Sequence, residues 1–170
     1  MQPLLSPCCD HLFPLYLFSI EYPGDSSEIS KDCYELKKTD SQGVVNSNSG
    51  GWQSRSHELM EGTDALKKLA AYVLHISNTT LLQVYGNYYS ALNPSSVCDW
   101  WVNINKGIDY NEPHTHGDNK FIAVYYPKLC SLPGELCIHS PMSMSLNFGN
   151  LFRITPIENR IYFLPGPIIH

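Results

Sequence analysis

The segment NEPHTHGDNK, residues 111–120, places three side chains that can bind a metal ion at intervals of two residues. These are His114, His116 and Asp118. Because side chains alternate between the two faces of an extended strand, the three would project to the same side if this segment were a regular strand. Imidazoles and a carboxylate on one face are a nucleus for binding a divalent metal such as non-haem iron.

A further histidine ligand is expected from the distant segment RIYFLPGPIIH, which ends at His170. This apolar run stops at a Pro-Gly-Pro turn and then delivers one histidine, which would meet the first pair at one end of a sheet. Two alternatives stay open at this point. The H-x-H pair can instead belong to a solvated polar loop, and Asp118 competes with His114 for the place of the third ligand.

The elements that position these residues are predicted from apolar runs and turn residues. Aromatic and β-branched runs separated by Gly, Pro and Asn predict antiparallel strands in the second half of the chain, at 98–105, 120–126, 134–139 and 159–165. In the first half, the pattern predicts a strand at 12–22, a helix at 27–38 and a second helix that begins near residue 63. The apolar segment SPMSMSLNFGNLF, residues 140–152, is interpreted as a lid over the site or as a plain covering loop.

Composition excludes several classes of function. A chain of 170 residues with 43% hydrophobic residues is long enough for one buried core. With a net charge of -5 there is no basic surface for nucleic acid. The six cysteines show neither C-x-x-C spacing nor the density of a disulfide framework, so we expect them to be reduced. The first twenty residues contain no Lys or Arg, which argues against an export signal, and no apolar run is long enough to span a membrane.

The run WWVNINKGIDYNEPHTHGDNKFIAVYYPK is preceded by NSGGWQS and followed by GELCIHSP and NRIYFLPGPIIH. This ordered set resembles the iron(II)- and 2-oxoglutarate-dependent oxygenases of marine phages and bacteria. Those proteins show a Trp-Asn strand, an H-x-H followed by a V-Y-Y strand, a G-x-L-x-F-x-x-P hairpin and a G-R-x-x-x-F-P-x-x-x-H strand. The resemblance runs from about residue 12 to the last residue. Each motif alone is weak, and their conserved order makes the set specific.

The resemblance implies an α+β, mainly β fold. The expected architecture is a double-stranded β-helix, a jelly-roll or cupin-like barrel, with N-terminal helices packed on one sheet. It implies a single oxygenase-like domain over residues 1–170, with the N-terminal strand and helices at 12–80 and the barrel strands at 97–170.

For the site, the resemblance implies a hydroxylase that uses Fe(2+), 2-oxoglutarate and dioxygen. The expected ligands are His114, His116 and His170, and Asp118 is a rival because the wider superfamily carries H-x-D/E. By strand alternation Tyr126 shares the face of His116, so its hydroxyl is a candidate contact for the co-substrate. Asn103 is a second candidate, since a polar side chain in an apolar strand needs a polar partner.

One departure from the family concerns the end of this sequence. Similar enzymes carry a further strand after the distal histidine, with an Arg that binds the far carboxylate of 2-oxoglutarate, whereas this sequence stops at His170. Arg153, Arg160 and Lys128 do not occupy that position. The expected domain therefore lacks its final C-terminal strand, and the exposed edge would be covered by a homodimer or by the N-terminal strand.

Two other functions stay open. A cupin-type three-histidine metal dioxygenase would show a similar histidine pattern, and a degenerate, non-catalytic β-barrel binding module would carry these histidines without a role. The substrate is expected to be peptidyl or a small molecule, received at a mouth lined by Trp100 or Trp101 and Tyr110. By the resemblance alone, we expect the protein in the cytoplasm of a bacterium or of a phage's bacterial host; charge and composition predict no nucleic-acid or membrane partner.

Overall fold

The computed structural model describes residues 15–81, 97–141 and 151–170. In chain order the elements are β1 (Phe18–Glu21), α1 (Ser26–Thr39), β2 (Asn48–Ser49), β3 (Trp52–Gln53), α2 (Asp64–Ile76), the π-helical turn η1 (Ser77–Leu81), β4 (Asn103–Ile104), β5 (Tyr110–Asn111), β6 (Phe121–Tyr126), β7 (Leu136–His139), β8 (Leu151–Ile154) and β9 (Arg160–Pro165). Both helices lie where the sequence predicts them.

The two helices begin at side-chain caps. The Asp25 carboxylate accepts a hydrogen bond from the Ser27 backbone N–H at 2.8 Å, and α1 ends with Lys37 and Lys38 near its negative pole. The Thr63 hydroxyl accepts from the Leu66 N–H at the start of α2. These caps satisfy donors that the first helical turn leaves free, which explains why both helices begin where they do.

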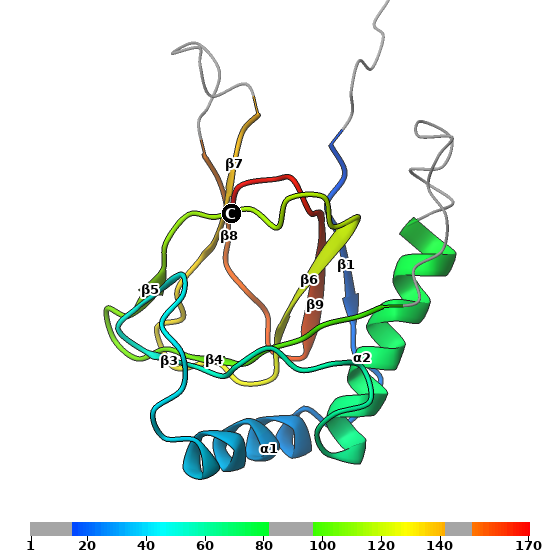
Figure 1. Ribbon diagram of the computed structural model, residues 1–170. Helices are drawn as coiled ribbons and strands as arrows, with labels where there is room; N and C mark the ends of the chain where they lie inside the picture. The colour runs from blue at the N-terminus through cyan, green and yellow to red at the C-terminus, as the bar shows by residue number, and fades with distance from the viewer. Residues whose placement is uncertain (1–14, 82–96, 142–150) are drawn as a thin grey trace, which may run out of the picture.

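Within residues 15–81, 97–141 and 151–170, the strands form four small antiparallel sheets. The three-stranded sheet has the order β1-β9-β6, and the two-stranded sheets are β2-β5, β3-β4 and β7-β8. In Figure 1, β6, β9 and β1 stand side by side, α2 lies along one side of the molecule, and α1 lies beneath the sheets. The N-terminal strand pairs with β9 over its full length, from Phe18 opposite Phe163 to Glu21 opposite Arg160, so one edge of the last strand is covered within the chain.

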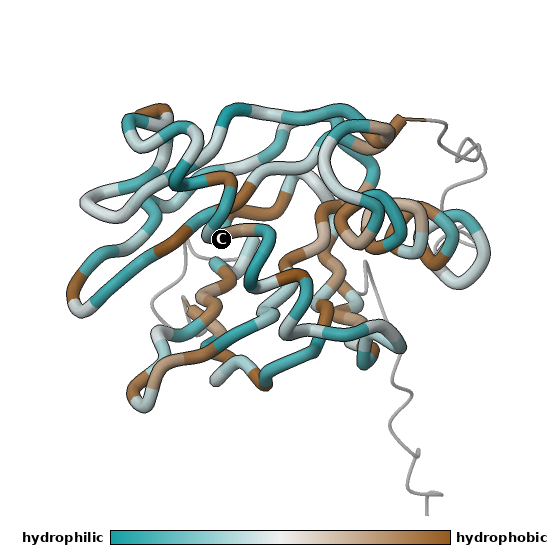
Figure 2. The backbone as a smooth tube through the Cα atoms, turned by 90° about the horizontal axis from the view of Figure 1, so that it is seen from below, coloured by the Kyte–Doolittle hydropathy of each residue, from teal (hydrophilic) through white to brown (hydrophobic). Residues whose placement is uncertain are grey.

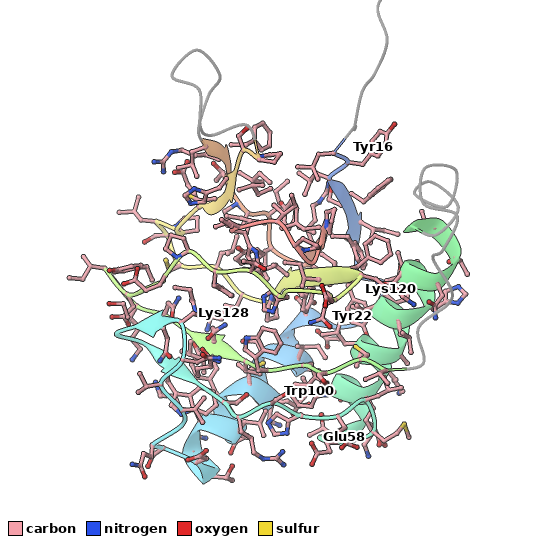
Figure 3. All side chains as sticks on the ribbon, turned by 45° about the horizontal axis from the view of Figure 1, so that its top comes forward. Tyr16, Tyr22, Glu58, Trp100, Lys120 and Lys128 are labelled. Atoms are coloured by element: carbon pink, nitrogen blue, oxygen red, sulfur yellow. The ribbon has the colours of Figure 1, made fainter. Side chains whose placement is uncertain are left out.

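The core lies between the helices and one face of the three-stranded sheet. Ile161 and Phe163 of β9 are fully buried there, with Ile29 of α1 and Leu66 of α2. Tyr22, which Figure 3 labels, packs its ring edge-on against Tyr125 at 5.6 Å. Figure 2 shows hydrophobic residues along α2, while the outer loops are mostly hydrophilic with single hydrophobic residues at their tips. The β9 residues of the other parity, Tyr162 and Leu164, are also buried, so this strand is covered on both faces.

The expectation of a double-stranded β-helix barrel is wrong for the part of the chain that the structure describes. No closed barrel forms there, and the architecture is a mixed α+β arrangement of small sheets. The reason is that the ladders stop early. Gly50 and Gly51 both adopt positive φ, 71° and 58°, so the chain turns between β2 and β3 after two paired residues. The predicted strand at 98–105 likewise shortens to Asn103–Ile104.

The segment expected to form a lid or covering loop also differs. Leu151–Ile154 form β8, which pairs with β7 from Leu136 opposite Ile154 to His139 opposite Leu151. The last two residues of the segment 140–152 therefore belong to a hairpin strand, and residues 142–150 lie outside the described residues. Among the helices in the described ranges, none combines the length and the apolar character that a membrane span requires.

Candidate metal centre

Three histidines from two distant segments meet at one place. One ring nitrogen from each of His114, His116 and His170 lies within 4.8 Å of the other two. The ring centroids are 4.9 Å apart for His114 and His116, 4.7 Å for His114 and His170, and 5.2 Å for His116 and His170. Nitrogens around a bound metal lie about 3 to 4 Å apart, so small ring movements would complete a coordination shell.

Backbone pairing brings the two segments together. The His114 N–H donates to the His170 carbonyl and the His170 N–H donates to the His114 carbonyl, both at 3.1 Å. The His116 N–H donates to the Gly166 carbonyl at 3.0 Å, and the Gly166 N–H donates to the Lys120 carbonyl at 3.2 Å. The segment before β6 and the segment after β9 therefore run antiparallel beyond the last regular pair of the ladder. Figure 1 shows the C-terminal segment beside the segment that leads into β6.

Gly166 allows this close approach. A Cβ atom at that position would overlap the carbonyl oxygen of Asn119, which is backbone and cannot move aside alone. A residue without a side chain is therefore required between Pro165 and the turn that carries His170.

Asp118 is not a member of the cluster. The expectation that it shares a face with the histidines assumes a regular strand, but the chain turns after His116. Gly117 has φ of 55°, and the Asn119 N–H donates back to the His116 carbonyl at 3.1 Å. The Asp118 side chain is exposed beyond this turn, so the arrangement favours the three-histidine set.

Hydrogen bonds select the nitrogen that each of two rings can offer. Nδ1 of His114 lies 2.8 Å from the Glu112 carbonyl, and Nδ1 of His170 lies 3.1 Å from the Ile168 carbonyl. A carbonyl oxygen only accepts, so Nδ1 carries the proton in both rings and Nε2 keeps its lone pair. A metal-binding histidine commonly donates its other ring N–H to a backbone carbonyl in this way.

The surroundings favour the neutral form of two of the rings. Burial, together with His170 and His114, lowers the pKa of His116 to about 4. Burial also lowers the pKa of His170, although the hydrogen bond to Ile168 acts in the opposite direction. A neutral imidazole is the form that binds a metal.

A pocket of about 320 Å³ opens beside the cluster. Its described lining residues are Val44, Asn46, Ser47, Gln53, Ser54, Arg55, Ser56, Trp101, His114 and His116. Such a volume is at the lower end of the range for small-molecule sites. The Trp101 ring lies 5.3 Å from the His116 ring, so this tryptophan, and not Trp100, stands next to the cluster.

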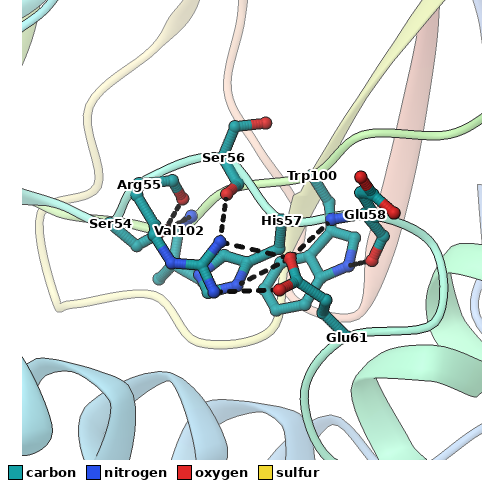
Figure 4. Close-up of polar contacts among 8 residues, drawn as sticks. All are labelled: Ser54, Arg55, Ser56, His57, Glu58, Glu61, Trp100 and Val102. Carbon is teal, nitrogen blue, oxygen red and sulfur yellow. Dashed lines mark hydrogen bonds and ion pairs between the residues drawn. The ribbon is translucent and has the colours of Figure 1, made fainter.

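Trp100 instead belongs to a neighbouring polar network (Figure 4). Its ring stacks on His57 at 4.3 Å, and its Nε1–H donates to the Glu58 carbonyl at 3.0 Å. In Figure 3, Trp100 and Glu58 lie near the start of α2. Burial and the nearby Arg55 lower the pKa of His57, so its ring is neutral and serves packing.

Arg55 and Glu61 form the charged part of this network. The Arg55 guanidinium donates to Glu61 Oε2 at 3.2 Å and to Oε1 at 3.0 Å, and it also donates to the Ser56 carbonyl. Arg55, assisted by the Glu58 N–H, holds the pKa of Glu61 at about 2. This ion pair holds the loop that carries Arg55, a residue that lines the pocket.

The two candidate contacts for a co-substrate lie in different places. Tyr126 is opposite Arg160 at the far end of β6, about 17 Å along the strand from Phe121, and it packs against Tyr162. Tyr126 therefore lies away from the histidine cluster. Strand alternation predicts which face a side chain takes, but it does not predict the distance of that side chain along the strand. Asn103 pairs with Gln53, which lines the pocket, but Asn103 itself is exposed and is not among the described lining residues.

The remaining basic residues considered from the sequence have other partners. Arg153 donates to Glu135 at 2.8 Å, Arg160 donates to Ser19 at 3.4 Å, and Lys128 lies 5.5 Å from the ring centre of Tyr34. None of them lines the pocket beside the cluster. Tyr110, which the sequence predicts at the mouth of the site, is also not among the described lining residues of this pocket. Its hydroxyl donates a hydrogen bond to the Glu112 carboxylate at 2.9 Å.

Sequence reasoning missed Gln53 and Arg55 as pocket residues. The motif NSGGWQS was noted as part of the resemblance, but nothing in its local pattern shows that it faces the histidines. No protein-family model matches this chain, and no curated protein matches it.

Proposed function

We propose that the three-histidine cluster is the iron(II) centre of a dioxygenase that uses 2-oxoglutarate to hydroxylate a small or peptidyl substrate. The observation that carries the proposal is the convergence of His114, His116 and His170, with one ring nitrogen of each within 4.8 Å of the others. Two of these rings already have Nδ1 bound to a carbonyl, which leaves Nε2 for the metal.

The residues fit iron(II) in number and type. Imidazole is a ligand that suits iron, and three protein ligands leave open positions on a metal that accepts six. Three neutral rings bring no negative charge, so the loaded site would keep the full double positive charge of the ion. Such a site favours an anionic chelating partner such as a 2-oxo acid.

When bound, iron and 2-oxoglutarate would supply a reaction in which decarboxylation of 2-oxoglutarate is coupled to hydroxylation of a substrate C–H bond. One oxygen atom of dioxygen enters the substrate and the other enters succinate, with release of carbon dioxide. The protein's own contribution is positional. The backbone pairing of His114 with His170 holds the ligands, and the half-buried rings beside Trp101 limit access of water.

The far carboxylate of the co-substrate needs a positive partner. Of the described residues that line the pocket, Arg55 alone carries a permanent charge. Its guanidinium is shared with Glu61, so a second carboxylate would have to share or displace that partner.

A second candidate function follows from the absence of Asp118 from the cluster. Three histidines without a carboxylate also suit a metal dioxygenase that uses no 2-oxo acid. The two functions differ in whether 2-oxoglutarate binds the metal.

An anaerobic titration with iron(II), with and without 2-oxoglutarate, separates these functions. We expect iron to bind and a visible charge-transfer band to appear when the 2-oxo acid chelates it. Iron uptake without a band favours the dioxygenase without a 2-oxo acid, and lack of iron uptake favours a non-catalytic module.

The matched variants are His116→Ala and Asp118→Ala, two residues apart. We expect His116→Ala to lose iron and the band, while Asp118→Ala keeps both. If Asp118→Ala loses the metal, the proposed ligand set is incorrect.

A further inference from the structure

Gln53 presents a buried hydrogen-bond acceptor with no partner. The side chain is 5% exposed, and its Oε1 atom has no hydrogen-bond partner among the residues that the structure describes. An unsatisfied buried acceptor costs free energy, so its retention in a pocket wall points to a donor that a ligand supplies. The terminal torsion of glutamine is soft, so the carboxamide can turn toward the pocket at little cost.

Gln53 stands on the same wall as the histidine cluster. It lines the pocket together with His114 and His116 and lies directly opposite Asn103 in the β3-β4 pair. Directly opposite residues project to the same face of a sheet. A ligand that touches Gln53 therefore lies in the pocket that the proposed metal centre shares.

The charges of this pocket favour a neutral donor. A bound metal ion would be doubly positive, and Arg55 is the one lining residue of permanent charge among those described. Both would repel an ammonium group. The other polar lining residues, Asn46, Ser47, Ser54 and Ser56, are uncharged and can accept as well as donate hydrogen bonds.

The Trp101 ring adds a preference for a flat group. It lines the pocket and is 37% exposed, so one part of its surface is available for contact. A planar amide can lie against an aromatic ring while its N–H points to a polar wall.

We propose that this pocket binds the primary substrate through a neutral carboxamide, whose N–H donates to Oε1 of Gln53. This assignment of substrate class rests on the proposed metal-dependent function, because it concerns the same site. It makes Gln53 a residue that positions substrate, with no role in holding the metal.

The test uses four probes of similar size with the full chain. These are propionamide, N,N-dimethylpropionamide, propionate and propan-1-ol, and their binding is followed by saturation-transfer NMR, which needs no metal. We expect propionamide to bind more tightly than the other three. Equal binding of the dimethyl amide or of propanol overturns the proposal, and so does preferred binding of propionate or no binding of any probe.

The matched variants are Gln53→Leu and Gln42→Leu, the latter at an exposed glutamine. Loss of one neutral hydrogen bond should weaken propionamide roughly two- to tenfold in Gln53→Leu, with no change in Gln42→Leu. An unchanged affinity in Gln53→Leu overturns the proposal. If Gln53→Leu does not fold, as judged by circular dichroism, the comparison of probes on the wild-type chain still decides.

Cobalt(II) locates the bound probe and separates the two hypotheses. In cobalt-loaded protein we expect faster relaxation of the propionamide methyl protons, and this effect should vanish in His116→Ala. If the chain takes up no cobalt, the metal centre fails while the saturation-transfer result still tests Gln53. If cobalt binds and the methyl relaxation stays unchanged, the probe lies elsewhere and the substrate assignment fails.

Discussion

Hydrogen bonds at single residues decide what the candidate ligands can do. The carbonyls of Glu112 and Ile168 place the proton on Nδ1 of His114 and His170, so each ring faces the cluster with a lone pair. Asp118 shows the opposite case, because a turn at Gly117 directs a good ligand to solvent. At this scale, backbone contacts select ligands as much as residue type does.

Burial of a single thiol gives a residue-scale prediction. Cys33 lies on the buried face of α1, and burial together with Asp32 raises its pKa to about 11. At about pH 8 only about one thiol in a thousand is ionised, and the thiolate is the reactive form. We expect iodoacetamide to modify the exposed Cys130 much faster than Cys33, as measured by peptide mass mapping.

Unfolding in urea is the control for this experiment, since it should make the two thiols react at similar rates. Rapid modification of Cys33 in the folded protein would show that α1 does not shield it.

At the scale of elements, the site depends on the junction between the segment before β6 and the segment after β9. Pairing of β6 with β9 runs from Tyr126 opposite Arg160 to Phe121 opposite Pro165. Beyond it, the chain continues antiparallel through irregular contacts that end at His114 and His170. The ladder therefore places two sequence-distant histidines in register, with their ring centroids 4.7 Å apart.

Gly166→Ala tests this junction. The added methyl group would overlap the backbone of Asn119, and a clash that forces the backbone to shift costs about 1–3 kcal/mol. We expect a lower free energy of unfolding in urea and weaker metal binding, because His170 follows four residues later.

Gly134→Ala is the matched control. A Cβ atom there meets nothing within 4 Å, so both stability and metal binding should remain near wild type. If Gly166→Ala is as stable as Gly134→Ala, the close approach does not constrain the junction.

At the scale of the whole molecule, the core and the candidate site occupy opposite ends of the same sheet. Ile161 and Phe163 anchor β9 under the helices, while the residues after Pro165 reach the histidine cluster. A ligand at the cluster would therefore tie the segment with His114 and His116 to the segment that ends at His170.

Metal binding should accordingly stabilise the folded protein. A metal at one hundred times its dissociation constant adds about 2.7 kcal/mol, and for a domain of this length that raises the melting temperature by several degrees. Calorimetry with iron(II) or cobalt(II) under anaerobic conditions checks this expectation. His116→Ala should show no such rise, and an equal rise in that variant would indicate binding elsewhere.

Alkaline pH should destabilise the fold. Burial raises the pKa of Cys33 from 9.0 to about 11 and that of Tyr126 from 10.0 to about 12, and it also raises the pKa of Tyr22 and Tyr125. These four groups ionise at lower pH in the unfolded chain than in the folded chain, so the stability that they contribute is fully present below about pH 9 and falls as the pH rises toward 11. Urea unfolding at about pH 8 and about pH 10.5 measures the difference.

Cys33→Ala should shift the onset of this loss toward about pH 10, where only the tyrosines contribute. A free energy of unfolding that stays constant up to about pH 10.5 would contradict the assignment of these groups as buried.

The sequence determines the local elements and identifies the three histidines that meet. Helical spacing and caps locate α1 and α2, β-branched runs locate β6, β7 and β9, and the H-x-H pair with His170 names the three rings that meet. These features follow from local propensity and from the chemistry of imidazole, which do not depend on the rest of the fold.

Only the tertiary structure decided the sheet arrangement, the exclusion of Asp118 and the position of Gln53 beside the histidines. Each depends on how far a ladder extends before a turn interrupts it. Gly50, Gly51 and Gly117 adopt positive φ, and the chain turns at each of them. Together these turns determine which distant segments come into contact. A sequence pattern predicts the face that a side chain takes on one strand, whereas distances between strands arise from packing of the whole chain.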